Sequence, residues 1–146
     1  YDKSGALKDM VQNHMLQMVA LLAMEAPISL NSEDIRAEKV KVLKSLRQLR
    51  PQDVRKNFVR GQYGEGTIND QRVIAYRDED RVASDSNTPT FVSGRLTIDN
   101  FRWAGVPFYI RTGKRMKSKC IQVVVEFKEV PMNLYYQTDR LLDSNY

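Results

Sequence analysis

The hydrophobic periodicity of this chain changes at Pro51, and that change limits the possible folds more than any other feature. Before Pro51, apolar residues recur every three or four positions, which is the spacing of one face of an α-helix. Beyond it, apolar residues fall in short alternating runs separated by stretches rich in Gly, Asp and Asn, which is typical of strands and turns. Two helices followed by a run of strands predict an α+β fold with a mainly antiparallel sheet.

Two helices are expected before Pro51. The first covers residues 4–25, with Ser4 as its N-cap and Pro27 ending the helical stretch. The second opens at Asn31 and extends toward Arg50. It is expected to end there because Pro51 disfavours a helical conformation of the residue before it. The apolar stripe of the first helix consists of Leu7, Met10, Val11, His14, Met15, Met18, Val19 and Leu22.

Strands are expected after Pro51, at residues 57–63, 72–76, 90–98, 108–112 and 120–130. A solvated loop at 78–89 and a turn at 99–105 separate them, and Trp103 is expected to anchor that turn. Cys120, at the start of the last strand, is expected to pack rather than react. No second domain is evident, so we expect residues 1–146 to form a single partial domain.

The excess positive charge lies in one short segment. The chain has 23 Lys and Arg against 18 Asp and Glu, a net charge of +5. The basic loop, residues 111–119, accounts for this excess with Arg111, Lys114, Arg115, Lys117 and Lys119. One reading is a site for a single anion such as a phosphate, and the other is a solvated hairpin tip. Nucleic-acid binding is a weaker alternative, because Phe108 and Tyr109 point to opposite faces of a strand.

Other classes of protein and site are excluded by composition. No apolar run reaches the roughly 18 residues that a membrane span needs, so we expect no membrane partner. A single cysteine and a single histidine exclude a disulfide framework and the usual zinc sites, and they fit a reducing compartment. No Gly-rich strand-to-helix turn is present, so nothing resembles a self-contained nucleotide site.

His14 is the sharpest candidate for chemistry. It is either a core histidine with one ring nitrogen hydrogen-bonded, or a neutral imidazole at the floor of a cleft that serves as a general base. Asp9 lies about 140° away around an α-helix, so it would not orient His14 from the same face. Asp9 can also be read as an acid that favours the first turn of the helix.

Four segments of the chain stand out in order: Asp-Met-Val-Gln-Asn-His-Met-Leu-Gln-Met from Asp9, Glu-Lys-Val-Lys-Val-Leu-Lys from Glu38, Arg-Gly-Gln-Tyr-Gly from Arg60, and Arg-Trp-Ala-Gly-Val-Pro-Phe-Tyr-Ile-Arg-Thr-Gly-Lys from Arg102. Together they resemble glucose-6-phosphate dehydrogenases of the bacterial type. The resemblance covers nearly the whole chain.

The resemblance implies roles for four residues. His14 matches the general base that takes the proton from the C1 hydroxyl of the sugar. Asp9, Lys114 and Lys119 match substrate-binding positions. The implied reaction oxidises glucose 6-phosphate to 6-phosphogluconolactone with NADP or NAD, the first step of the oxidative pentose phosphate pathway, in a cytoplasmic enzyme that needs no metal.

The chain begins at Tyr1 without an initiator methionine, and we expect an internal fragment from the start of the family's C-terminal β+α domain. The N-terminal Rossmann domain, where the coenzyme site is expected, would be absent, and the fragment alone would be inactive. The alternative is a non-catalytic binding or dimerisation module, since the family's large sheet forms a homodimer contact.

Overall fold

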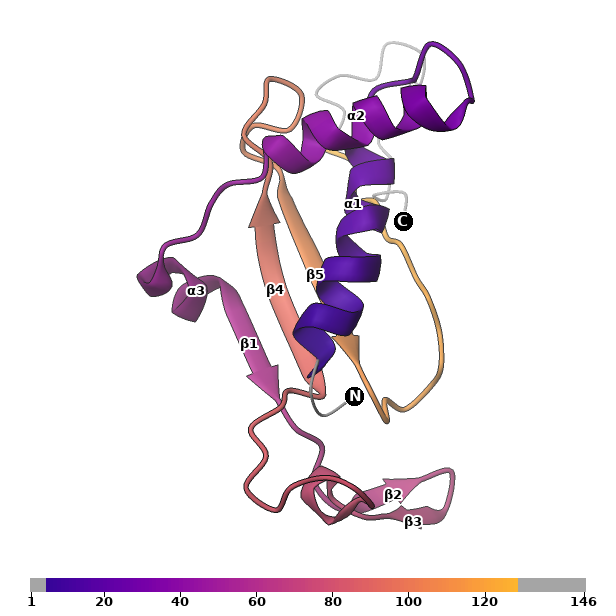
Figure 1. Cartoon of the computed structure of the whole chain (residues 1–146), viewed down its shortest axis with the longest axis vertical. Helices are drawn as coiled ribbons and strands as arrows, with labels where there is room; N and C mark the ends of the chain where they lie inside the picture. The colour runs from indigo at the N-terminus through magenta and orange to yellow at the C-terminus, as the bar shows by residue number, and fades with distance from the viewer. Residues whose placement is uncertain (1–4, 129–146) are drawn as a thin grey trace, which may run out of the picture.

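The computed structural model describes residues 5–128 and has the expected α+β organisation (Figure 1). The rod formed by η1 and α1 lies across the β4–β5 hairpin, with α2 crossing one end and the β2–β3 hairpin projecting at the other. In chain order the elements are the π-helix η1 (Leu7–Met15), α1 (Leu16–Ala23), α2 (Ser32–Lys44), α3 (Pro51–Asn57), β1 (Phe58–Gly61), β2 (Gly66–Ile68), β3 (Gln71–Val73), the 3-10 turn η2 (Tyr76–Asp78), β4 (Phe91–Thr97) and β5 (Pro107–Gly113).

The main sheet is antiparallel with strand order β1-β4-β5. Because side chains alternate along a strand, Val92 of β4 and Ile110 of β5 lie on the face that the helices cover, whereas Tyr109 on the opposite face is 75% exposed. The sheet therefore has one buried and one open face. The core cluster consists of Ala6, Val11, Val19, Ala20, Ala23, Val42, Val92, Ile98 and Ile110.

The first helix is confirmed as one continuous rod through η1 and α1, but its buried face is narrower than expected. Val11 and Val19 are buried, whereas Leu7, His14 and Leu22 are exposed. The π-helical hydrogen bonding of η1 changes the angular spacing of its residues, so a stripe drawn for 3.6 residues per turn does not stay on one face. The expected N-cap, Ser4, lies outside the described residues.

The second helix begins where expected and ends early. The side chain of Asn31 caps α2 by accepting a hydrogen bond from a first-turn backbone N–H at 2.8 Å. The helix stops at Lys44 and does not extend toward Arg50. The reason is a tertiary contact. The backbone N–H of Arg47 donates to the carbonyl of Thr97, the last residue of β4, at 2.9 Å and so is bonded to the sheet rather than within the helix.

A third helix, α3, was not expected from the sequence. Pro51 occupies its first turn, and the Asp53 carboxylate accepts a hydrogen bond from the Arg50 N–H at 3.3 Å. Proline at the first helical position is a known start signal. The sequence therefore contained the signal, but the change of periodicity at Pro51 favoured strand.

Three of the expected strands are confirmed as β1, β4 and β5, and a fourth is shorter than expected. Residues 72–76 contribute only β3, which pairs with the unexpected strand β2. Asn69 and Asp70 connect them with φ of 48° and 62°. Two adjacent left-handed residues are typical of the type I′ turn that joins tight hairpins.

The expected strand at residues 120–130 is wrong over residues 120–128, which are exposed and form no strand. This segment leaves the end of β5 in a wide arc (Figure 1). A strand forms only when a neighbouring strand satisfies its backbone groups, and no described strand lies beside this segment. Cys120 is consequently exposed rather than packed, and residues 129 and 130 lie outside the described part of the chain.

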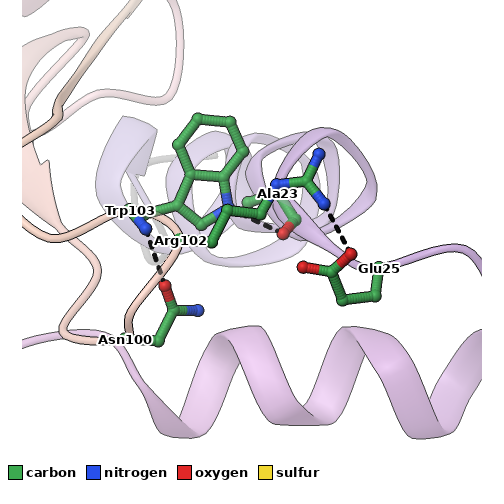
Figure 2. A network of polar contacts seen from close by, with 5 residues as sticks. All are labelled: Ala23, Glu25, Asn100, Arg102 and Trp103. Atoms are coloured by element: carbon green, nitrogen blue, oxygen red, sulfur yellow. Dashed lines mark hydrogen bonds and ion pairs between the residues drawn. The ribbon is translucent and has the colours of Figure 1, made fainter.

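The turn between β4 and β5 is anchored as expected by Trp103 (Figure 2). Its indole N–H donates to the carbonyl of Ala23 at 2.8 Å, and its ring packs edge-on against Phe108. Arg102 forms an ion pair with Glu25 at 2.5 Å. The turn is therefore fastened to the C-terminal end of α1 as well as to the sheet.

Candidate functional site

Asp9 and His14 are neighbours on the described helix, contrary to the expected separation of about 140°. Both lie in η1, whose hydrogen bonds join residues five apart, as the bond from the Leu16 N–H to the Val11 carbonyl illustrates. Residues five apart in a π-helix stand in the relation that residues four apart have in an α-helix. The π-helix thus brings a carboxylate and an imidazole to adjacent turns of one face.

His14 is exposed, and it makes no hydrogen bond or ion pair with any other residue in the described part of the chain. The reading of His14 as a buried core histidine is therefore wrong. Asp9 is half-buried on the same helix. An accessible imidazole beside a carboxylate can accept a proton from a bound hydroxyl group.

The start of η1 and the end of β5 meet at one end of the sheet. The backbone N–H of Ala6 donates to the carbonyl of Pro89 at 2.8 Å. The next residue, Thr90, accepts a hydrogen bond from the backbone N–H of Lys114 through its carbonyl at 2.9 Å. Asp9 is three residues along the helix from Ala6, so the structure brings Asp9 and Lys114 to the same end of the sheet.

His14 lies farther along the same rod. It is eight positions along the rod from Ala6. The rod packs against β5 along this length. The imidazole therefore lies toward the middle of the hairpin, with Asp9 between it and the Lys114 end.

Lys119 is not brought to this site. It is exposed in the segment that leaves β5, as are Lys117 and Cys120. No hydrogen bond or ion pair joins Lys119 to another described residue. The structure thus places Lys114 at the end of the sheet where η1 begins, whereas Lys117 and Lys119 are exposed in the segment that follows β5.

A pocket of about 250 Å³ lies beside Lys114 and was not expected from the sequence. Its lining includes Lys114, Tyr63, Tyr76 and Glu79. Arg115 forms an ion pair with Glu79 next to it. Tyr63 belongs to the Arg-Gly-Gln-Tyr-Gly segment, but nothing in that motif indicates which carboxylate or cation the tyrosine meets.

The pKa values of two groups beside this pocket are raised. Burial raises the pKa of the Tyr63 phenol, and its hydrogen bond to Glu79 adds to that effect while Arg115 opposes it. The hydrogen bonds of Arg115 with Tyr63 and Glu79 raise the pKa of its guanidinium. The phenol is therefore protonated and the guanidinium charged at neutral pH, and the raised pKa values extend these states to higher pH.

Among the described residues, no cluster of His, Cys, Asp and Glu could hold a metal ion, and no helix is long and apolar enough to span a bilayer. A dinucleotide site is not formed either, since the main sheet is antiparallel and no Gly-rich turn leads from a strand into a helix there.

Comparison with known proteins places this chain in a family. The family model of the glucose-6-phosphate dehydrogenase C-terminal domain matches residues 1–146. The chain is 65% identical over 145 residues to a glucose-6-phosphate 1-dehydrogenase of Bacillus subtilis and 50% identical over 136 residues to that of Mycolicibacterium smegmatis. These matches cover 99% and 92% of the chain but only 30% and 27% of the two relatives.

Solved structures agree with the family match. One is a glucose-6-phosphate dehydrogenase in complex with its substrate glucose 6-phosphate, with a TM-score of 0.65 and 38% identity. Another is the glucose-6-phosphate 1-dehydrogenase of Mycobacterium avium, with a TM-score of 0.64 and 41% identity. Each likeness covers 77% of this chain and 22% of the solved chain. The chain therefore belongs to the glucose-6-phosphate dehydrogenase C-terminal domain family.

Proposed function

We propose that this chain supplies the general base and part of the sugar-phosphate site of an enzyme that oxidises glucose 6-phosphate to 6-phosphogluconolactone. The observation that carries the proposal is the placement of Asp9 and an exposed His14 on adjacent turns of a π-helix whose start lies at the same end of the sheet as Lys114. The solved relative with bound glucose 6-phosphate supports the choice of substrate. In this proposal the enzyme is a cytoplasmic homodimer. Its reaction is the first step of the oxidative pentose phosphate pathway.

His14 performs the proton half of the reaction. Oxidation of a hemiacetal removes a hydride from C1 and a proton from the C1 hydroxyl. A bound nicotinamide coenzyme, NADP or NAD, would accept the hydride. A neutral imidazole can accept that proton as a general base.

Asp9 and Lys114 would hold the sugar in place for that transfer. A carboxylate accepts hydrogen bonds from sugar hydroxyls, and an ammonium group binds the phosphate dianion. We assign Lys119 to the phosphate as well, which requires the segment after β5 to approach the site in the assembled enzyme. Fixed contacts of this kind convert binding into correct orientation of C1 against its base.

The coenzyme does not fit the described residues, for lack of a dinucleotide-binding turn. We therefore assign coenzyme binding to a region outside these 146 residues, and we regard the chain as one partial domain of the enzyme. The purified chain is then expected to be inactive. Reduction of NADP by it in the presence of glucose 6-phosphate, followed at 340 nm, would contradict this assignment.

The open face of the sheet favours a second role in assembly. Val59 and Tyr109 on this face are 65% and 75% exposed. An exposed apolar and aromatic pair on one sheet face is a feature that another protein layer can cover. We propose that this face contributes to the homodimer of the enzyme.

The decisive experiment replaces the matching segment of the 65%-identical Bacillus subtilis relative with this chain. The hybrid enzyme should oxidise glucose 6-phosphate, and His14→Asn should lower its kcat by about 10²- to 10⁴-fold with little change in KM, because only proton transfer is lost. Gln12→Asn, on the exposed side of the same helix, is the matched control and should keep normal turnover.

Two results would overturn the proposal. A folded hybrid without activity would show that this chain does not carry the site. A His14→Asn hybrid with near-normal kcat would show that another group takes the proton.

A further inference from the structure

Arg115 differs from its neighbours in the basic loop because it is held by a carboxylate and an aromatic ring. Its guanidinium forms an ion pair with Glu79 and lies over the ring of Tyr63, with Cζ 5.3 Å from the ring centroid. The Tyr63 hydroxyl donates to the same Glu79 oxygen at 3.1 Å. Guanidinium, carboxylate and phenol thus form a closed cluster, which we call the Arg115 clamp (Arg115, Glu79 and Tyr63).

The clamp is joined to the backbone of Lys114 through Thr90, which is fully buried. The Thr90 hydroxyl accepts a hydrogen bond from the Tyr63 N–H at 2.9 Å, and its carbonyl accepts one from the Lys114 N–H at 2.9 Å. The buried Thr90 therefore holds both the tyrosine of the clamp and the peptide that carries Lys114. The Tyr76 ring, buried edge-on against Tyr63 at 5.5 Å, supports the clamp from behind.

The turn that presents Lys114 has little freedom at either side. At Gly113, an added Cβ would lie 2.9 Å from a ring carbon of Phe91, so only glycine fits without a shift of that ring. Arg115 has φ of 53°, a left-handed conformation that side chains with a Cβ rarely adopt. Such a conformation persists where surrounding contacts impose it, and the Arg115 clamp supplies those contacts.

The clamp and Lys114 also share the pocket described above. Lys114, Tyr63 and Glu79 all line it. The side-chain atoms of Arg115 and Glu79 are 36% and 27% exposed, so the ion pair is partly shielded from water. A partly shielded Arg–carboxylate pair restrains its residues more strongly than a fully solvated one.

We propose that Arg115 is a positioning residue, which sets the turn from which Lys114 reaches the phosphate of the sugar by clamping Glu79 and Tyr63. This inference rests on the proposed function, since it assigns Arg115 a part in substrate binding. It predicts that loss of the clamp weakens binding of glucose 6-phosphate while the proton-transfer machinery on η1 stays intact.

The test is steady-state kinetics of the hybrid enzyme with three variants, Arg115→Ala, Glu79→Gln and the double variant. Each single change should raise the KM for glucose 6-phosphate by roughly tenfold with kcat nearly unchanged. The double variant should be no worse than either single one, because both remove the same clamp. Arg115→Lys, which keeps the charge but not the planar fork, should recover part of the loss.

Arg102→Ala is the matched control, because it breaks another Arg–Glu pair that also lies over an aromatic ring, at the far end of the hairpin. It should leave KM unchanged. The inference is overturned if Arg115→Ala leaves KM unchanged in an active hybrid, if kcat falls as much as kcat/KM, or if Arg102→Ala raises KM equally.

The failure of the proposed function would look different. In that case the unsubstituted hybrid is itself inactive. Stabilisation of the hybrid by glucose 6-phosphate in a thermal shift assay then decides the inference: a shift that Arg115→Ala abolishes supports the clamp, and a hybrid with no shift overturns both proposals.

Discussion

The two ends of the β4–β5 hairpin carry the same trio of groups and differ in what lies beside them. At the turn, Arg102 lies over the Trp103 ring at 5.4 Å and pairs with Glu25. At the open end, Arg115 lies over the Tyr63 ring at 5.3 Å and pairs with Glu79. The first trio fastens a turn to the end of α1, whereas the second borders a pocket that Lys114 also lines.

Exposure separates the two trios as well. The charged side chains at the turn are 51% and 62% exposed, against 36% and 27% at the open end. Exposed ion pairs contribute little to stability, so the turn depends on its tryptophan rather than its arginine. The same three groups, an arginine, a glutamate and an aromatic ring, are therefore structural at the turn and, in our proposal, part of a binding site at the open end.

The strongest way to break the turn end is Trp103→Ala. We expect it to lower the free energy of unfolding of the chain by about 3 kcal/mol, because it removes a packed ring and the hydrogen bond to Ala23. Urea denaturation followed by far-UV circular dichroism measures the change. A loss below about 1 kcal/mol would mean that the turn does not depend on this anchor.

At the open end, Lys114→Ala should raise the KM of the hybrid enzyme for glucose 6-phosphate by about 10- to 100-fold, the value of a charge-assisted hydrogen bond. Lys119→Ala should have a smaller effect, about threefold, since its ammonium group is exposed and screened. Unchanged KM in both variants would remove the basic loop from the substrate site.

Tyr63→Phe removes the hydroxyl group of the Arg115 clamp and makes its contribution to stability measurable as a function of pH. It should cost about 1 kcal/mol of stability near neutral pH, because Glu79 loses a donor while the ring stays in place. The raised pKa of Tyr63 means that the protonated phenol stabilises the fold fully below its ordinary pKa near 10, and that this contribution is lost as pH rises through the folded-state pKa.

The difference in urea midpoint between the unsubstituted chain and Tyr63→Phe should accordingly shrink between pH 8 and pH 11. A difference that is constant over this range would show that the phenol titrates as freely in the folded chain as in the unfolded one.

The smallest effect is expected for Arg102→Ala, below about 1 kcal/mol, because its ion pair is exposed on both sides. Urea denaturation followed by the fluorescence of Trp103, the single tryptophan of the chain, measures the change at this turn. A loss of more than 2 kcal/mol would show that the arginine, and not only the indole, holds the turn.

Much of the fold followed from local pattern. The N-cap at Asn31 and the alternation in residues 90–98 were sufficient to locate α2 and β4, because each signal acts within a few residues. The expected strand at 120–130 failed for the opposite reason, since its backbone groups need a neighbour that local sequence cannot supply. Motif and charge indicated His14 and Lys114 as candidate site residues, but nothing in the sequence indicated the pocket beside Lys114.

The α+β class, the position of the excess charge and the family to which the four segments point all follow from the amino-acid sequence alone. Which side chains contact one another depends on how the elements pack. Asp9 and His14 became neighbours only through the π-helix, and Arg115 pairs with Glu79, a residue 36 positions away in the sequence. Hydrophobic periodicity is a local property that can be read directly from the sequence. Which carboxylate pairs with a given arginine depends instead on how distant segments pack.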